Sequence, residues 1–320
     1  MNYFTILLAF LGLCVHVSLC GHEVLHGWSQ SQSRDDPDFL HPHELAIVQF
    51  DSRPLQDYWN SSVQWNYAFA NKWGHKYIYL TTDNDKSDFC AHPSSLELSA
   101  VWCKVKAMVM AKQKLAASAQ VKAFLYMDSD MAVTIEGNYS LTDVINFIRK
   151  DLSWDVRQMP VAFNQDGPGW ACKHAIQDVG YSFCFNSGTV LWMNNAISQK
   201  ILHQWWMLAA QPYHKSKFPE DWRTRWPWEQ AQMYAVYDKF HRYIMRLSFP
   251  KEPFLPWTST KNPKAQYPTD FVEPWCFSHW PGANCFLTHF CGSLNQKRRL
   301  RDEYVVEFDK GRPPFPTAFI

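Results

Sequence analysis

The sequence has little net charge and a small share of charged residues. It contains 31 Lys and Arg and 30 Asp and Glu, so its formal net charge is +1. Without an excess of basic residues, the sequence does not indicate a protein that binds nucleic acid or anionic lipid through its charge. It also lacks internal repeats and low-complexity tracts, and no linker divides it, which favours a single folded domain over a repeat array.

Aromatic residues, in contrast, are abundant. They make up 16% of the chain, which includes 16 Trp. Such an apolar composition excludes a disordered protein. The indoles have two interpretations, a heavily aromatic core or a surface that stacks against the apolar faces of sugars. Composition alone leaves both open.

The N-terminal segment indicates the secretory pathway. Residues 3–20 form an uncharged apolar run, which predicts either a signal peptide cleaved after Cys20 or an uncleaved signal anchor. The sequons at Asn60 and Asn138 agree with a luminal or extracellular chain. We therefore expect a leader or anchor over 1–20, a short stem over 21–43 and the folded domain over 44–320. Contact with a membrane is expected only through the leader, if it is not cleaved.

Nine cysteines are present, and none forms the paired C-x-x-C pattern of a zinc site. Seven lie beyond the leader, and in an oxidising lumen disulfides are the expected use for them. Because seven is odd, at least one thiol is unpaired or joins another chain. The pairing cannot be read from the sequence.

The first 130 residues alternate between strands and helices. Apolar runs predict strands over 44–50, 76–82 and 122–127, and helical spacing predicts helices over 58–72 and 101–118. This alternation is typical of an α/β protein with a parallel sheet, which binds ligands at the carboxyl ends of its strands. The second half is mixed, with expected strands over 160–165 and 188–194 and expected helices over 141–150, 198–210 and 229–240.

An acidic pair, Asp128 and Asp130, follows the third expected strand. In an extended segment these two carboxylates would point to the same side, where a divalent cation could separate them. D-x-D alone is common and is also consistent with a solvated turn, but the preceding strand favours a metal. His289 ends the apolar run 285–290, and as a third ligand it would suit Mn²⁺ better than Ca²⁺. A structural histidine is the alternative.

Other polar residues follow the same pattern at element ends. Lys104 begins a helix, where a cation is unfavourable unless an anion lies close. A glycine that precedes a strand permits close approach of a ligand, and two indoles beside a carboxylate and an amide suit a sugar. A basic cluster near the C-terminus could face a diphosphate. Each of these has an ordinary structural alternative; the residues concerned are Asn186, Gly188, Trp226, Trp228, Glu229, Gln230 and Lys297 to Arg301.

Taken in order, these motifs resemble glycosyltransferase family 34, the galactosyl/mannosyl/xylosyltransferases. Fungal Golgi α-mannosyltransferases and plant xyloglucan xylosyltransferases belong to this family. The resemblance runs from about Trp65 to Gly292. It rests on Trp102-x-Lys104, FLYMDSDMAV (124–133), FNSGTVLWMNN (185–195), WPWEQ (226–230) and THFCG (288–292).

The resemblance implies a GT-A fold, a Rossmann-like and mostly parallel mixed sheet flanked by helices. It implies a retaining enzyme that moves a hexose or pentose from a UDP- or GDP-sugar to a glycan or glycoconjugate hydroxyl, by front-face attack, in the Golgi lumen as a type II membrane protein or after secretion. Mn²⁺ (or Mg²⁺) and the donor would be bound by residues that match family motifs, and the sugar would be steadied by others. The implied metal ligands are Asp128, Asp130 and His289, the implied donor contacts are Lys104, Asp128, Asn186, Gly188 and Lys297, and the implied catalytic residues are Gln230, Glu229 and Asp166.

The sequence departs from the family in two places. Glu229 stands where Asp is more usual, and Leu294 stands where a Lys is expected, the nearest basic residue being Lys297. Rival hypotheses are another retaining GT-A transferase and a luminal sugar-binding protein derived from an inactive transferase. A glycoside hydrolase would need two carboxylates about 5–10 Å apart across a cleft. Whether the chain forms a homodimer is left open.

Overall fold

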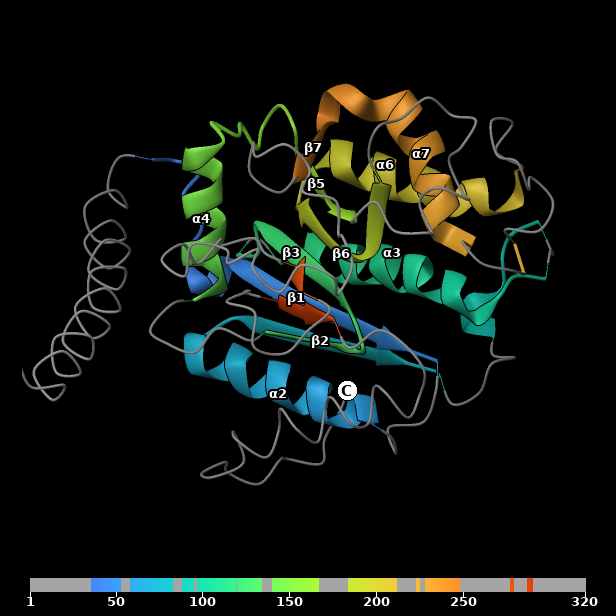
Figure 1. Cartoon of the computed structure of the whole chain (residues 1–320), viewed down its shortest axis with the longest axis horizontal. Coiled ribbons are helices and arrows are strands. Elements are labelled where there is room, and N and C mark those ends of the chain that lie inside the picture. The colour runs from blue at the N-terminus through green and yellow to red at the C-terminus, as the bar shows by residue number, and fades with distance from the viewer. Residues whose placement is uncertain are drawn as a thin grey trace, which may run out of the picture.

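The structure is a computed structural model that describes residues 36–52, 58–82, 88–94, 97–118, 120–133, 140–166, 184–211, 223–224, 228–247, 277–278 and 287–289. Its centre is a six-stranded sheet with the strand order β2-β1-β3-β6-β5-β7 (Figure 1). The strands are β1 (Leu45–Asp51), β2 (Lys76–Thr81), β3 (Ala123–Asp128), β5 (Val161–Asp166), β6 (Cys184–Met193) and β7 (Ile244–Leu247).

The sheet is mixed because one strand runs against the others. β1 is parallel to β2 and β3, β5 is parallel to β7, and β6 is antiparallel to both of its neighbours, β3 and β5. A second, small sheet has the order β4-β9-β8, built from β4 (Met131–Val133), β9 (Leu287–His289) and β8 (Phe277–Ser278). The turn between β3 and β4 therefore joins the two sheets.

Helices cover both faces of the large sheet. Alternate residues of each strand point to opposite faces, so Phe124 and Tyr126 of β3 belong to one apolar cluster and Leu125 and Met127 to the other. The first cluster includes α3, α6 and α7, and the second includes α2 and α4 (Figure 1). The helices are α2 (Tyr58–Trp73), α3 (Cys103–Ala116), α4 (Leu141–Asp151), α6 (Ala196–Met207) and α7 (Trp228–Phe240), with short 3₁₀ turns at Pro42–Glu44, Asp88–Cys90, Ala100–Trp102, Leu208–Ala210 and His241–Tyr243.

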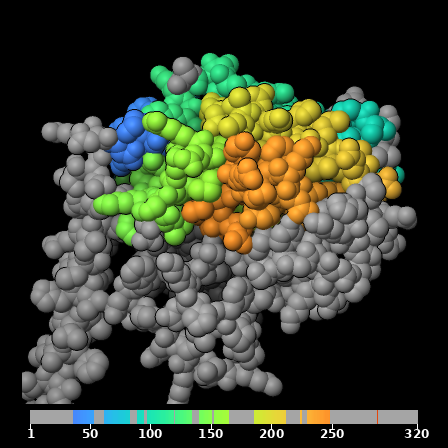
Figure 2. All heavy atoms as spheres, turned by 90° about the horizontal axis from the view of Figure 1, so that it is seen from above, coloured from blue at the N-terminus to red at the C-terminus, as the bar shows by residue number. Residues whose placement is uncertain are grey.

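The segment before β1 packs onto α4. Asn146 accepts a hydrogen bond from the Leu40 N–H at 3.0 Å and donates one to the Leu40 carbonyl at 2.8 Å, and the Leu40 side chain is buried. In Figure 2 this segment (blue) lies beside α4 (green), with α6 (yellow) and α7 (orange) adjacent to one another. The segment before β1, in which Phe39 and Leu40 are buried, therefore packs onto the folded domain.

Several of the described tryptophans are core residues. The side chains of Trp102, Trp192 and Trp205 are fully buried, which confirms the aromatic-core interpretation for these three. Cys90 and Cys103 form a disulfide, as expected for an oxidising compartment. It ties the Asp88–Cys90 turn to the first residue of α3.

The expected elements agree well with the structure, and the mixed, mostly parallel sheet is confirmed. The exceptions are that β6 begins at residue 184 and not at 188, and that the strands β4, β7, β8 and β9 were not expected. Among the described residues no helix is both long and apolar enough to cross a membrane. The leader over 1–20 lies outside the described residues.

Candidate functional site

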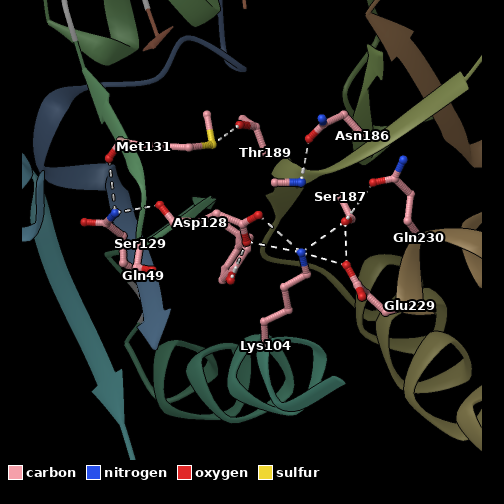
Figure 3. A network of polar contacts seen from close by, with 12 residues as sticks. Gln49, Lys104, Asp128, Ser129, Met131, Asn186, Ser187, Thr189, Glu229 and Gln230 are labelled. Atoms are coloured by element: carbon pink, nitrogen blue, oxygen red, sulfur yellow. Dashed lines mark hydrogen bonds and ion pairs between the residues drawn. The ribbon is translucent and has the colours of Figure 1, made fainter. Parts of the chain in front are cut away.

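The candidate site lies at the edge where β3 ends. Because β6 is antiparallel to β3, its N-terminal part lies at the carboxyl end of β3, and the first residues of α3 and α7 meet the same edge (Figure 3). This placement brings together Lys104, Asp128, Asn186, Gly188, Glu229 and Gln230, six of the residues expected from the sequence.

Lys104 is the centre of this group. Its ammonium lies 2.7 Å from Glu229 Oε1, 3.2 Å from Asp128 Oδ1 and 3.0 Å from Ser187 Oγ. The Lys104 and Glu229 side chains are 9% and 3% exposed, whereas Asp128 is 22% exposed. The anion that the helix position of Lys104 required is thus supplied by the protein itself.

The charges of the group explain the ionisation of Lys104. Burial alone lowers the pKa of a lysine, but the nearby Asp128 and Glu229 carboxylates outweigh it, so the pKa of Lys104 is raised above the ordinary lysine value. Tyr126 donates a hydrogen bond to Asp128 Oδ1 at 3.0 Å, and burial, with Asp128 in addition, raises the pKa of its phenol. Both groups therefore present protons to Asp128 at neutral pH.

Gly188 allows β6 to approach Asp128 closely. A Cβ at this position would lie 2.9 Å from Asp128 Oδ2 and 2.9 Å from Asn186 Oδ1, too close for either. Asn186 Oδ1 instead accepts a hydrogen bond from the Gly188 N–H at 2.7 Å. The close approach expected at this glycine is present, and the group that it admits is a carboxylate of the protein. Both residues lie inside β6, not before it as the sequence pattern suggested.

Ser187 connects α7 to the cluster and was not expected. Its hydroxyl lies 2.7 Å from Glu229 Oε1 and 3.4 Å from Gln230 Oε1. Because one hydroxyl has one proton, the shorter contact with Glu229 is the better hydrogen bond. Serine between Asn186 and Gly188 has no distinctive sequence signal, and only the strand pairing shows that it faces Lys104.

The expectation that Asp128 and Asp130 share one side of a strand is wrong. β3 ends at Asp128, and Ser129 and Asp130 form a turn before β4 begins at Met131. Ser129 donates a hydrogen bond to Asp51 at the end of β1, and Asp130 is largely buried. The two carboxylates therefore belong to a tight turn, in which their relative orientation depends on how that turn is held.

The strand β9 brings His289 to this turn. The register of β4 and β9 pairs His289 with Met131, next to Asp130 in the chain. The side chains of His289 and Asp166 lie outside the described residues, although the backbone of Asp166 ends β5, and Lys297 lies outside them entirely. Among the side chains that are described, no group of three or more His, Cys, Asp or Glu could hold a metal ion.

One solved structure supports the fold. A glycosyltransferase involved in the glycosylation of the major capsid of PBCV-1 superposes with a TM-score of 0.51 at 14% sequence identity, over 81% of this chain and 98% of that one. An active-site mutant of LgtC gives a TM-score of 0.41 at 12% identity, over 81% of this chain and 95% of that one. No protein-family model and no curated protein sequence matches this chain.

The chain therefore has a glycosyltransferase fold of the GT-A type, as a mostly parallel six-stranded sheet flanked by helices in one domain. At 14% identity the likeness extends to the fold alone. It does not reach family 34 in particular, and that resemblance stays a prediction.

Proposed function

We propose that this chain is a metal-dependent, retaining glycosyltransferase that moves a hexose or pentose from a UDP- or GDP-sugar to a glycan hydroxyl. One observation carries the proposal: the Lys104, Asp128 and Glu229 cluster lies at the carboxyl edge of β3, in a chain with a glycosyltransferase fold. In open α/β sheets ligands bind at this edge. Lys104, Asp128 and Glu229 also belong to the motifs that resemble family 34, and this resemblance supports a nucleotide-sugar donor.

The chemistry of the residues fits a divalent cation. With its carboxylates ionised, the cluster contains one positive and two negative charges, so it carries a net charge of −1, and Asp130 follows two residues after Asp128. Asp128 is the most exposed of the three side chains, so its carboxylate remains accessible from solvent. Asp128, Asp130 and His289 would hold Mn²⁺, which tolerates two carboxylates and an imidazole, whereas Mg²⁺ would be held mainly by the carboxylates.

A cation there would stabilise the negative charge that develops on the leaving nucleoside diphosphate. Lys104 donates hydrogen bonds to both oxygens of the Asp128 carboxylate, and its charge would add positive potential near the diphosphate. Glu229 holds Lys104 in place, and Gln230, which is half-buried, binds a hydroxyl of the sugar. The acceptor hydroxyl attacks the anomeric carbon from the face that the diphosphate leaves, the C–O bond to the diphosphate breaks, and the hydroxyl proton passes to a diphosphate oxygen.

We place this activity in the secretory pathway, in the Golgi lumen or outside the cell. The apolar run 3–20, the two sequons and the Cys90–Cys103 disulfide all support that placement.

Donor hydrolysis tests the function. We expect the full chain, incubated with a panel of UDP- and GDP-sugars, to release nucleotide from one donor only when Mn²⁺ is present, and to be stabilised thermally by that donor with Mn²⁺. Asp130→Asn should abolish the release. Asp155→Asn is the matched control, because the Asp155 carboxylate also holds a turn, where it accepts the Arg157 N–H at 2.8 Å. Asp155 precedes β5, whose first residues pair with the end of β6, at the edge of the sheet opposite to Asp128.

The alternative is a sugar-binding protein derived from an inactive transferase. The Leu at position 294 favours it, because the phosphate contact expected there is missing. A folded chain that binds a free glycan but neither binds nor hydrolyses any donor, with or without Mn²⁺, would establish this alternative in place of the transferase.

A further inference from the structure

The turn between β3 and β4 is held by side chains from the α2 face of the sheet. Gln49 of β1 donates to the Asp128 carbonyl at 3.0 Å, and Asn66 of α2 donates to the Met131 carbonyl at 2.8 Å (Figure 3 shows Gln49 beside the turn). Ser62 of α2 donates to the Ser129 carbonyl. Three carbonyls of one short turn therefore accept hydrogen bonds from side chains.

Gln49 and Asn66 also bond to each other, and each of their polar atoms has a partner. Asn66 Nδ2 lies 3.0 Å from Gln49 Oε1, which also accepts the Tyr77 hydroxyl at 2.7 Å. Asn66 Oδ1 accepts the Val133 N–H of β4 at 2.9 Å. Both amide side chains are fully buried.

A buried pair of primary amides needs a reason. Burying an amide lowers stability unless all its hydrogen bonds are made. An apolar pair of the same size would fill this part of the core without that requirement. A fully satisfied amide network has one geometry, so it fixes the backbone that it contacts. Ser62 and Asn66 are four residues apart on α2 and so lie on the same helix face, which here faces the turn.

The residues fixed in this way are those of the proposed cation site. The turn carries Asp128 and Asp130, and Met131, whose carbonyl Asn66 holds, is the residue that pairs with His289 across β4 and β9. Lys104 meets the Asp128 carboxylate from the α3 face, while Gln49 holds the Asp128 carbonyl from the α2 face. The two faces of the sheet thus fix the same residue independently.

We propose that Gln49 and Asn66 are positioning residues for the cation site, which set the relative placement of Asp128, Asp130 and β9. This inference rests on the proposed function, since it assumes that the turn binds a divalent cation. Partners that orient metal ligands without touching the metal change its affinity by about 10- to 100-fold when they are removed. Gln49→Met and Asn66→Ala remove the donors to the Asp128 and Met131 carbonyls, respectively.

The experiment is a titration of the full chain with Mn²⁺ alone, in which electron paramagnetic resonance measures the free ion. We expect each variant to bind Mn²⁺ about 10- to 100-fold more weakly than the unmodified chain. The matched control is Asn146→Ala, because Asn146 is also a buried helix amide that makes two bonds to one stretch of backbone, at Leu40 in the segment before β1. It should lower the melting temperature but leave the Mn²⁺ affinity unchanged.

Each outcome is decisive. If Gln49→Met and Asn66→Ala fold and bind Mn²⁺ as the unmodified chain does, Gln49 and Asn66 serve stability alone and the inference fails while the proposed function stands. If the unmodified chain does not bind Mn²⁺, the proposed cation site fails and this inference fails with it. Should Asn66→Ala not fold, Ser62→Ala, which loses only the bond to the Ser129 carbonyl, takes its place with an expected loss of severalfold.

Discussion

The Lys104 ammonium lies 2.7 Å from Glu229 Oε1, so a single buried cation joins the beginning of α3 to the beginning of α7. The same ammonium reaches Asp128 at the end of β3. Three elements that are distant in the sequence are therefore held at one edge of the sheet by charge. The positions of both carboxylates at this edge therefore depend on Lys104.

Lys104→Met should destabilise the chain strongly. The change leaves the Glu229 and Asp128 carboxylates together without their cation, and Glu229 is almost entirely buried. Removing one partner of a buried pair lowers the free energy of unfolding by about 3–5 kcal/mol. Denaturant unfolding measures the loss, and adding Glu229→Gln to the variant should recover part of it.

The control for this prediction is the same substitution at an exposed ion pair. Lys122 lies 2.8 Å from Glu44, but its side chain is 45% exposed, and such a pair contributes at most about 1 kcal/mol. Equal losses for Lys104→Met and Lys122→Met would contradict the view that burial makes the Lys104 contacts important.

Gly188→Ala should disturb the Asp128 carboxylate. The new Cβ would lie 2.9 Å from Asp128 Oδ2, so the carboxylate has to move, with a loss of about 1–3 kcal/mol in stability. Because a misplacement of about 1 Å can reduce a reaction by about 100-fold, Mn²⁺-dependent donor hydrolysis should fall far more than stability does. Nucleotide release and thermal unfolding, measured on the same sample, separate the two effects.

Gly74→Ala is the matched glycine control. Gly74 has a φ of 75° and no atom within 4 Å of an added Cβ, so the change strains the backbone without touching the site. It should reduce stability by about 1–2 kcal/mol and leave hydrolysis unchanged. A similar loss of hydrolysis in both variants would mean that the Gly188 effect comes from a weakened fold.

The sequence predicted the elements well because their signals are local. The helix of which Lys104 is part and the strand that ends at Asp128 each have a periodicity or an apolar run that a short window contains. The glycine at position 188 likewise indicates that another group lies close to the backbone, without showing which group it is. These features required no knowledge of which strands pair.

The site residues that the sequence did not predict depend on pairing between distant segments. Ser187 was not predicted because its importance comes from the antiparallel register of β6 with β3. In the sequence, Gln49 is a polar residue in an apolar strand. Only the tertiary structure shows that its Nε2 lies 3.0 Å from the Asp128 carbonyl oxygen. The error about Asp130 has the same origin, because the sequence pattern does not show that the chain turns after Asp128 and enters a second sheet, in which β4 pairs with β9.

The Cys90–Cys103 disulfide should stabilise the N-terminal end of α3. It closes a loop of 13 residues in the unfolded chain, which corresponds to about 3 kcal/mol. We expect the Cys90→Ser/Cys103→Ser variant to unfold at correspondingly lower denaturant, and a reducing agent to destabilise the unmodified chain by at least as much. An unmodified chain whose stability does not respond to reduction would contradict the prediction.

Lys112 should make stability rise in alkaline solution. Its ammonium is buried between the Met193 carbonyl and Asn194 Oδ1, at 3.0 and 3.2 Å, and burial lowers its pKa from 10.5 to about 8. Between pH 8 and 10.5 the unfolded chain therefore keeps a proton that the folded chain has lost, so the free energy of unfolding increases with pH by up to about 3 kcal/mol.

Lys112→Met should remove this increase, and the difference between the two unfolding curves isolates Lys112 from the other groups that titrate in base. Tyr77 and Tyr126 are such groups: burial raises the pKa of both phenols, so above pH 10 they act in the opposite direction. Lys114→Met, an exposed position on the same helix, is the control and should follow the unmodified chain. If the Lys112→Met curve also follows that of the unmodified chain at every pH, the prediction is wrong. The pKa of Lys112 would then be that of an ordinary lysine, because its hydrogen bonds to the end of β6 offset the effect of burial.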